Sequence, residues 1–415
     1  MAQSSPVLGI DFGTSNSAAG ILLDGKPHLI EIEPGQKTLP TTFFFDFDSR
    51  QTLIGSPANA ALINGLEGRF MRALKRVLGT GLMHEKRQIL NERVTFVDII
   101  ARFLSRIKTR AEAQTGLSFD TALSGRPVNF HGPGDAREAQ AEDDLRQCYL
   151  AAGFKGVNFL PEPEAAAIAS GATNGRGLIV DIGGGTSDFS LFETRADGQV
   201  NILANHGIRI GGTDFDRAIN VDTVMPLLGK GTQLRKDIGA GLLTTPNAIF
   251  NDLATWEKIP FLYTAQTRRM ASDMLTLAEE PVKLQRLVTV LEDELGHDLA
   301  FAVERGKIAA NAPDTAQARI QLDMIERGLS APLDALDIAR SLSNFAMELH
   351  SGARDTLQMA DCAPQSVRHV VYVGGSSLMS LVPQAMHALF PDAEHSFTEV
   401  FTAVADGLAI SGNRP

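Results

Sequence analysis

The fold of this chain depends on one stretch, Gly177-Leu-Ile-Val-Asp-Ile-Gly-Gly-Gly-Thr-Ser-Asp-Phe-Ser-Leu-Phe192. Its apolar run predicts a buried strand, its three glycines predict a turn, and the alternation after Asp188 predicts a returning strand. Asp181 and Asp188 flank the tip of this hairpin. Consecutive glycines allow backbone N–H groups to converge on an anion, and nearby carboxylates suit an accompanying Mg²⁺ ion. The stretch therefore predicts a Mg-phosphate site, the alternative being a tight glycine turn with solvated acids.

A second stretch near the N-terminus follows the same plan. Val7 to Leu23 contains an apolar strand, Asp11, a glycine, Thr14 and a second apolar strand. A strand–Asp–Gly–Thr–strand unit that occurs twice predicts two related domains, each presenting a phosphate loop to a shared cleft. Asp24-Gly25 predicts a turn into a further strand, so the first domain is expected to open with an antiparallel meander.

Composition narrows the class of protein. The chain has 415 residues and 44% hydrophobic content, enough for two or more domains with cores. The net charge is −11 and the cations are scattered, which argues against a nucleic-acid partner. Cys148 and Cys362 are too few for a disulfide framework or a metal knuckle. No leader is evident and no apolar run approaches about 18 residues, so we expect a cytoplasmic protein without a membrane partner.

Two further segments contain charged residues, Lys75 and Glu162, whose roles have more than one interpretation. Arg69 to Leu78 has helical periodicity that ends at Gly79, and Lys75 lies toward its last turn. Without further context, the four cations Arg69, Arg72, Lys75 and Arg76 are expected on a solvated helix face. Asn91 is expected to cap the long helix that follows. Glu162 precedes a helix expected to begin at Pro163, where it serves either the helix dipole or a cleft.

The second half of the chain contains two more glycine turns. Gly211-Gly212 precedes Thr213-x-x-Asp216, which resembles a capping box and predicts an anion site at a helix N-terminus. Residues 226–365 are predicted to form a mostly helical inserted lobe, in which Glu304 and Lys307 share a helix face as an ordinary surface ion pair would. Residues 368–386 predict a strand, a Gly-Gly-Ser turn and an amphipathic helix, an arrangement that places ligands at the carboxyl end of the strand.

The chain contains neither a P-loop nor a dinucleotide fingerprint, and no zincin or nucleophile-elbow motif is evident. It resembles the actin-like ATPase superfamily, and more closely the nucleotide-binding domain of DnaK-type chaperones, the heat shock protein 70 family. The resemblance rests on six blocks in the family's order: Ile10-Asp-Phe-Gly-Thr-Ser-Asn-Ser17, Ala73-Leu-Lys-Arg-Val-Leu-Gly79, Pro161-Glu-Pro-Glu-Ala-Ala-Ala-Ile-Ala169, Val180-Asp-Ile-Gly-Gly-Gly-Thr-Ser-Asp188, Gly211-Gly-Thr-Asp-Phe-Asp216 and Val373-Gly-Gly-Ser376.

This resemblance implies an α/β, actin-like ATPase (ribonuclease H-like) fold with two related domains that flank a nucleotide cleft. Residues 1–176 would form domain I. Residues 177–415 would form domain II, including the helical lobe at about 226–365, and the C-terminal helix would return to domain I. The family continues through a linker into a peptide-binding β-sandwich where this chain ends, so the resemblance indicates a short, YegD-like branch.

The resemblance also implies roles for individual residues. Asp11 and Asp181 would hold Mg²⁺ through its waters, while Lys75 would reach the phosphates and the attacking water. Glu162 and Asp188 would orient that water and the metal shell, and Thr186 would complete the catalytic set of Lys75, Glu162, Asp181, Thr186 and Asp188. The phosphate contacts would come from Gly13, Thr14, Ser15, Asn16, Gly183, Gly184, Gly185 and Thr186. The ribose and adenine contacts would come from Gly211, Gly212, Glu304, Lys307, Ile308, Gly374, Gly375, Ser376 and Leu378.

Two of these positions depart from the family. Ile308 and Leu378 stand where family members usually carry arginines that sandwich the adenine, so cation–π stacking is lost while apolar burial of the base remains. The expected function is that of an ATP-binding, slowly hydrolysing chaperone-like ATPase, which couples Mg-ATP and ADP states to domain closure and to an unfolded or regulatory protein partner. The alternatives are an actin-like filament or nucleotide-sensing protein and, after them, a small-molecule kinase.

Overall fold

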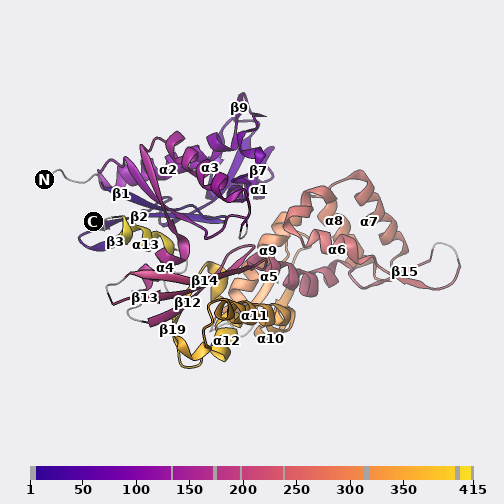
Figure 1. Cartoon of the computed structure of the whole chain (residues 1–415). Helices are drawn as coiled ribbons and strands as arrows, with labels where there is room; N and C mark the ends of the chain where they lie inside the picture. Colours follow the sequence, from indigo (N-terminus) through magenta and orange to yellow (C-terminus); the bar gives the residue numbers. More distant parts are fainter. Residues whose placement is uncertain are drawn as a thin grey trace. The chain divides into compact units, whose positions relative to one another are not determined.

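The computed structural model contains two mixed β-sheets built on the same plan (Figure 1). It describes residues 6–131, 134–171, 175–196, 199–236, 239–312, 318–397 and 402–412. The first sheet has the order β11 (Gly156–Pro161), β10 (Thr121–Arg126), β1 (Val7–Asp11), β2 (Asn16–Leu23), β3 (Lys26–Leu29), and β4 (Thr38–Pro40) also pairs with β2. The second has the order β14 (Val200–Ile208), β13 (Ser187–Thr194), β12 (Gly175–Ile182), β19 (Val367–Val373), β20 (Glu394–Phe397).

The strand directions repeat between the two sheets. In the first sheet, β1 pairs antiparallel with β2 and parallel with β10. In the second, β12 pairs antiparallel with β13 and parallel with β19. Both predicted hairpins are therefore confirmed. Each is followed by a third antiparallel strand, as the turn at Asp24-Gly25 predicted for the first sheet.

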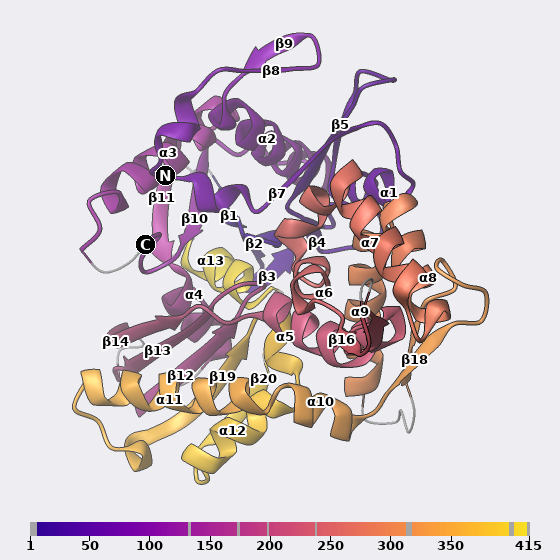
Figure 2. The same ribbon diagram turned by 90° about the vertical axis from the view of Figure 1, so that its right-hand side faces the viewer.

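Two helices with small side chains lie between the sheets, α4 (Glu162–Ser170) and α13 (Ala403–Ser411) (Figures 1 and 2). Helix α13 contacts β1, β2 and β3, and α4 contacts α13 and strands of the second sheet. The two helices approach so closely that a Cβ at Gly407 would lie 1.8 Å from the carbonyl oxygen of Ala165. Ala165, Ala166 and Ala167 are buried in the cluster that joins both sheets. Small residues are needed here because larger side chains would separate the helices.

The outer face of the first sheet is covered by α2 (Phe96–Thr115) and α3 (Glu138–Ala151), which pack on each other. Thr95 caps α2, since its hydroxyl accepts from the Asp98 N–H and the Asp98 carboxylate accepts from the Thr95 N–H. The prediction that Asn91 is the cap was wrong. Asn91 lies in the turn between two short strands, β8 (Arg87–Ile89) and β9 (Glu92–Val94), whose pairing ends before the helix begins.

The helix predicted over residues 69–78 is also absent. Residues Gly68–Arg72 form β7, which pairs with β5 (Thr42–Asp46), and β6 (Thr52–Ile54) pairs on the other side of β5. The remainder forms a short 3-10 turn, η1 (Leu74–Val77), followed by η2 (Gly81–His84). The buried strand β5 supplies a hydrogen-bonding partner from a distant part of the sequence, and this pairing outweighs the helical periodicity. The helix α1 (Ser56–Ile63) packs beside β5.

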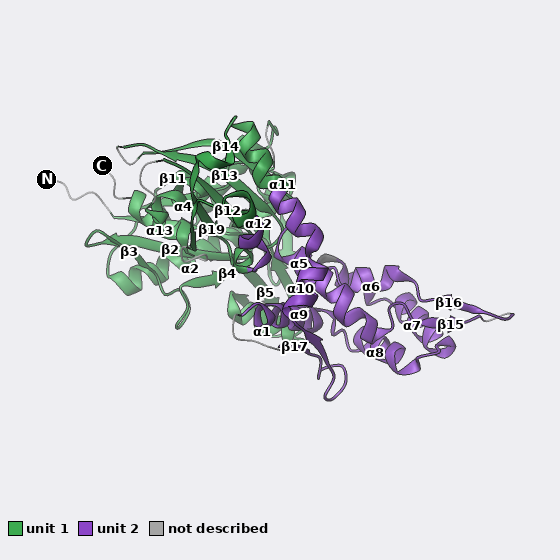
Figure 3. Cartoon of the chain, turned by 90° about the horizontal axis from the view of Figure 1, so that it is seen from below, with its two compact units in different colours: residues 1–208, 351–378, 386–415 green, residues 209–350, 379–385 purple. Residues whose placement is uncertain are grey.

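Contacts divide the chain into two units, coloured separately in Figure 3. Unit 1 comprises residues 1–208, 351–378 and 386–415 and contains both sheets. Unit 2 comprises residues 209–350 and 379–385. The predicted boundary between domains I and II at residue 176 lies between the two sheets, both of which belong to unit 1. This division into domains stays a prediction.

Unit 2 is mostly helical, with two small hairpins. Its elements are α5 (Gly212–Ile219), η3 (Asn220–Val224), η4 (Met225–Leu228), β15 (Gln233–Arg235), β16 (Leu242–Thr244), α6 (Asn247–Leu253), η5 (Trp256–Leu262), α7 (Ala265–Leu277), α8 (Pro281–Glu292), α9 (Gly296–Asn311), β17 (Ala318–Gln321), β18 (Ser330–Leu333) and α10 (Ala335–Ser341). Helices α11 (Ser343–Met359) and α12 (Leu381–Leu389) each have residues in both units. The 3-10 turns η6 (Pro364–Ser366) and η7 (Gly375–Leu378) belong to unit 1. None of the helices in the described ranges has the length and hydropathy that a bilayer-spanning helix needs.

Candidate functional site

Two aspartates are directly opposed on the glycine hairpin. Asp181 on β12 pairs in register with Asp188 on β13, and the tip between them closes with a hydrogen bond of 2.9 Å from the Gly183 N–H to the Thr186 carbonyl. The turn after β19 packs against the same place. Gly374 has a φ of 78°, and a Cβ there would lie 2.7 Å from Asp181 Oδ1. Glycine at position 374 is required both by its backbone angle and by the space that the Asp181 carboxylate occupies.

The N-terminal loop comes close to this hairpin. Asp11 ends β1, and the next residues turn so tightly that a Cβ at Gly13 would lie 2.0 Å from the Asn16 carbonyl oxygen. A Cβ at Gly184 would lie 2.8 Å from Ser15 Oγ. The structure therefore brings the two predicted phosphate loops, residues 13–16 and 183–186, together within unit 1.

Lys75 and Glu162 form an ion pair beside these loops. Lys75 Nζ donates to Glu162 Oε1 at 2.5 Å, and the two side chains are only 10% and 17% exposed. Lys75 lies in the 3-10 turn η1, which follows Ala73 in the left-handed conformation at φ 59°. The prediction that Lys75 belongs to a solvated helix face was wrong, because the turn directs its side chain to the partly buried Glu162 carboxylate instead.

Burial and mutual repulsion raise the pKa of three carboxyl groups near this pair. The pKa of Asp11 rises to about 7, mainly through burial and then through the charge of Glu162. The pKa of Asp181 rises to about 8, through burial and the charges of Asp188, Glu162 and Asp11. Asp188 is the most exposed of the three, and its pKa rises least, to about 6, through burial and then Glu162.

Lys75 is the cation in this group of acids. Burial by itself would lower the pKa of Lys75, but attraction to Glu162 and Asp11 outweighs burial and raises it. The ammonium is therefore charged at neutral pH, and it faces four carboxyl groups. A further cation would lower the pKa of the three raised acids, because an opposite charge favours the ionised form.

The residues present fit a hydrated Mg²⁺ ion with phosphate. Mg²⁺ keeps several of its waters and is usually held by one or two carboxylates together with substrate phosphates. In the part of the chain that the structure describes, no three His, Cys, Asp or Glu side chains are grouped so that they could hold a metal directly. Asp11 and Asp181 would be the carboxylates that hold the waters, and the two glycine loops would hold the phosphates.

Arg76 is a site residue that sequence reasoning missed. It was assigned to the solvated face with Lys75, yet its guanidinium lies over the glycine hairpin. A Cβ at Gly185 would lie 2.2 Å from Arg76 Nη2. Its position directly after Lys75 was a possible signal, but only the η1 turn brings both cations to the loops. Arg76 is exposed and would meet an anion held at the hairpin.

Glu162 is supported by the strands that lead to it. It is the first residue of α4 and directly follows β11, and the prediction that it precedes the helix was off by one position. Arg126, at the end of β10, lies in register with Pro161. A Cβ at Gly125 would lie 3.2 Å from Glu162 Cγ, so the neighbouring strand leaves little free space around this side chain.

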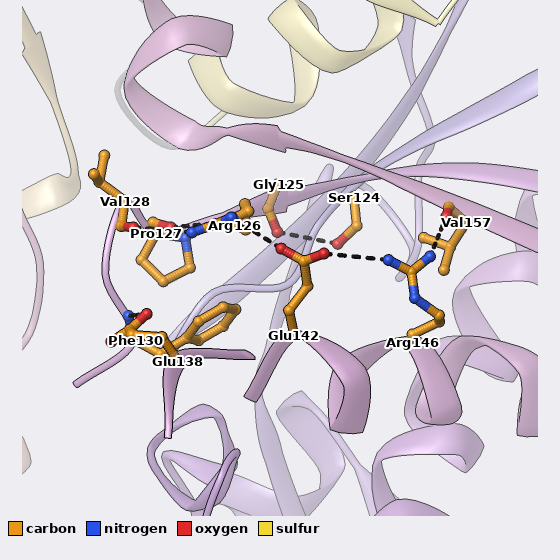
Figure 4. A network of polar contacts seen from close by, with 10 residues as sticks. All are labelled: Ser124, Gly125, Arg126, Pro127, Val128, Phe130, Glu138, Glu142, Arg146 and Val157. Atoms are coloured by element: carbon orange, nitrogen blue, oxygen red, sulfur yellow. Dashed lines mark hydrogen bonds and ion pairs between the residues drawn. The ribbon is translucent and has the colours of Figure 1, made fainter. Parts of the chain in front are cut away.

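A polar network holds the ends of these strands to α3 (Figure 4). Glu142 accepts from Arg126 Nη1 at 2.9 Å and from Arg146 Nη2 at 3.2 Å. Arg126 also donates to the carbonyls of Pro127 and Val128. Arg146 donates to the Val157 carbonyl on β11 at 2.9 Å. Two arginines bound to one carboxylate thus fix α3 to both strands.

The predicted adenosine contacts are divided between the units. Gly211, Gly212, Glu304, Lys307 and Ile308 belong to unit 2, whereas Gly374, Gly375, Ser376 and Leu378 belong to unit 1. The predicted capping box at Thr213 and Asp216 was wrong, since α5 begins two residues earlier, with Gly211 as its N-cap, and Asp214 accepts from the Gly211 N–H at 3.0 Å.

Lys307 has a different partner from the one considered. It is nearly buried and pairs with Asp216 of α5 at 2.8 Å, while Glu304 is exposed. The Glu304–Lys307 surface pair is therefore not what the structure contains. The capping position in the first turn of α5 is held by Asp214, and Asp216 pairs with Lys307 instead.

The model of the family "Hsp70 protein" matches residues 7–238, more than half of the chain. The chain belongs to the Hsp70 family. It is 35% identical over 321 residues to the chaperone protein DnaK of Thermoplasma acidophilum, an alignment that covers 73% of this chain and 50% of the relative. It is 35% identical over 247 residues to DnaK of Thermoplasma volcanium, which covers 57% of this chain and 38% of the relative. This Hsp70-family chain spans half or less of the length of these curated relatives, and its two mixed sheets have the actin-like ATPase fold of the family.

Proposed function

We propose that this Hsp70-family chain binds Mg-ATP and Mg-ADP, hydrolyses ATP slowly, and couples the nucleotide state to domain closure and to a protein partner. The observation that carries the proposal is the group of acids with raised pKa around the partly buried Lys75–Glu162 pair, next to two neighbouring glycine loops. Hsp70 domains bind ATP and ADP, and this group of residues suits a nucleotide with its metal.

Phosphoryl transfer needs positioning and charge stabilisation more than covalent chemistry from the protein. Lys75 would place its ammonium against the transferred phosphate and the attacking water. Glu162 holds that ammonium and, with Asp188, would orient the water. The backbone N–H groups and the hydroxyls of Thr14 and Thr186 would contact the phosphates. A bound Mg²⁺ would supply the positive charge that neutralises the phosphate oxygens.

The adenosine site is expected to rely on apolar contact. Ile308 is 61% exposed on α9, so its side chain is available to a base rather than committed to the core of unit 2. Lys307 is held by Asp216 and would present a hydrogen-bond donor with a fixed position. Apolar burial of the base by a side chain such as Ile308 is less specific for adenine than stacked arginines are.

Isothermal titration calorimetry tests the binding part of the proposal. We expect ADP and ATP to bind in the presence of Mg²⁺ and to bind at least tenfold more weakly after chelation, because the acids then repel the phosphates. Absence of Mg-dependent nucleotide binding would overturn the proposal.

Steady-state hydrolysis with and without an unfolded protein tests the output. Stimulation by the unfolded protein would support a chaperone-like role. Indifference to it would favour a nucleotide switch that acts on a regulatory partner. Membership of a YegD-like branch and a cytoplasmic location stay predictions, the former supported by the Gly125-Arg-Pro-Val-Asn-Phe130 and Glu304-Arg-Gly-Lys-Ile308 stretches.

A further inference from the structure

A buried carboxylate outside the proposed nucleotide contacts holds the segment that follows Lys75. Asp144 lies on α3 and its side chain is completely buried. Its Oδ2 accepts from the Gly79 N–H at 2.8 Å, and its Oδ1 accepts from His84 Nε2 at 2.9 Å and Gln140 Nε2 at 2.8 Å. A buried carboxylate is retained only where such donors compensate for its lost hydration.

Two of these donors belong to one segment, residues 79–84, which directly follows the η1 turn with Lys75 and Arg76. Gly79 has a φ of 75°, and a Cβ there would lie 2.8 Å from the Arg137 carbonyl oxygen. The preceding Leu78 carbonyl accepts from His131 Nε2 at 2.7 Å. Residues 78–84 are therefore held by α3 and by His131, which lies before α3 in the sequence.

Helix α3 is itself anchored to the strands that lead to Glu162. Glu142 on α3 binds Arg126 at the end of β10, and Arg146 on α3 binds the Val157 carbonyl of β11 (Figure 4). One helix thus carries the anchors for both partners of the ion pair, Asp144 for the Lys75 segment and Glu142 for the strand ends before Glu162.

We propose that Asp144 is a positioning residue for Lys75, which sets the distance between the Lys75 ammonium and the reacting phosphate without touching the nucleotide. This inference rests on the proposed ATPase function. Without Asp144, the Gly79 N–H is buried without its acceptor and the segment from Lys75 to His84 loses its attachment to α3. A displacement of about 1 Å at a reacting group can lower the rate about 100-fold. A residue that does not contact the nucleotide, such as Asp144, can therefore govern hydrolysis through the position of Lys75.

The primary test compares the full chain with Asp144→Ala. We expect single-turnover ATP hydrolysis to fall by about 10- to 100-fold, while the Kd for Mg-ADP changes by less than about threefold, since the phosphate loops lie on other strands. Cys148→Ala is the matched control, because Cys148 is fully buried one turn further along α3 and packs in the hydrophobic core. It should lower the unfolding temperature and leave the hydrolysis rate within about twofold.

A double-mutant cycle distinguishes an effect of Asp144 on the position of Lys75 from a general destabilisation of the fold. If Asp144 acts through Lys75, then Lys75→Ala/Asp144→Ala should hydrolyse ATP at the same rate as Lys75→Ala alone. Equal proportional losses in both backgrounds would overturn the positioning role. Hydrogen exchange of the nucleotide-free protein gives a second readout, in which peptides covering residues 74–84 should exchange faster in Asp144→Ala than in Cys148→Ala.

His84 offers a variant that does not depend on a buried substitution, because its side chain is 57% exposed. We expect His84→Ala to slow hydrolysis severalfold and His84→Gln, which retains a donor for Asp144, to restore most of the rate. A wild-type chain that does not hydrolyse ATP would overturn the proposed function itself. Normal wild-type hydrolysis that neither Asp144→Ala nor His84→Ala slows would overturn only the role of Asp144.

Discussion

Asp181 and Asp188 face each other across the β12–β13 hairpin, in register and with like charge. Like charges directly opposite on neighbouring strands destabilise a sheet. Burial first and Asp188 second raise the pKa of Asp181 to about 8. The hairpin is therefore a place where the folded chain without a bound cation retains a proton or pays an electrostatic cost.

This relationship predicts how stability depends on pH. The unfolded pKa of an aspartate is about 4, whereas those of folded Asp11, Asp181 and Asp188 are about 7, 8 and 6. Between these values the folded state binds more protons than the unfolded state, so the free energy of unfolding falls as pH rises. We expect the unfolding temperature without nucleotide to fall by several degrees from about pH 5.5 to about pH 8, as measured by calorimetry.

Two comparisons check this origin of the pH dependence. Mg-ADP should flatten the profile, because bound cations favour the ionised acids. Asp181→Asn should also flatten it and raise the unfolding temperature at pH 8, since the like-charge pair is removed. A profile that stays unchanged in Asp181→Asn would contradict the assignment.

Lys75→Ala should separate hydrolysis from binding. We expect single-turnover hydrolysis to fall by about 100-fold or more, because a charged group is lost at the place where phosphate charge develops, while Mg-ADP binding is retained. Lys155→Ala is the matched control, because Lys155 pairs with Asp120 through a 77% exposed side chain and such pairs contribute little. Equal hydrolysis rates in the two variants would remove Lys75 from the catalytic set.

Gly374→Ala should disturb the site in two ways, by straining the backbone at a positive φ and by placing a methyl group in occupied space. Gly374 has a φ of 78°, and the new methyl group would meet Asp181 Oδ1 and the Ile182 carbonyl oxygen. Gly25→Ala provides the control for the backbone angle alone, since Gly25 has a φ of 74° and its Cβ would meet open space. We expect about 1–2 kcal/mol of destabilisation in Gly25→Ala and more in Gly374→Ala, measured by urea unfolding.

Nucleotide affinity gives the discriminating readout for this pair of variants. Gly374→Ala should weaken Mg-ADP binding, whereas Gly25→Ala should leave the Kd unchanged. If both variants bind Mg-ADP as the wild type does, Asp181 is not held by the turn after β19.

Ile308→Arg should strengthen adenine nucleotide binding. An arginine over an aromatic face contributes about 0.5–2 kcal/mol, so we expect the Kd for Mg-ATP to fall by about 2- to 30-fold. Val282→Arg on α8 is the control, because the Val282 side chain is 61% exposed, as that of Ile308 is, and the substitution adds the same charge to unit 2. An equal gain in both variants would assign the effect to net charge rather than to the base.

Several features of the site were predictable because their cause is local. The glycine loops after Asp11 and Asp181 require backbone angles and close approaches that glycine supplies, and both hairpins formed where the apolar alternation indicated. The Gly171 end of α4 is likewise encoded in one residue, whose φ is 66°. Motif spacing then linked these stretches to a nucleotide-binding family, which the Hsp70 match to residues 7–238 bears out.

Other features had no local cause, and the predictions failed there. Residues 69–72 form a strand because β5 offers a partner, and the periodicity of the segment contains no information about β5. Arg76 reaches the glycine hairpin only through the η1 turn. Asp144 is an ordinary acid on a helix until the fold places Gly79 and His84 against it.

The strand–glycine–strand hairpins, the aspartates that flank them and the resemblance to the family could all be predicted, since they follow from backbone conformation and residue order. Which charges meet depends on the folded arrangement: Lys75 pairs with Glu162, Lys307 pairs with Asp216, and Asp144 binds the segment after Lys75. Electrostatic energies and pKa values depend on distance and burial in space. Partners that are 60 to 91 residues apart along the chain become neighbours only after the fold has formed.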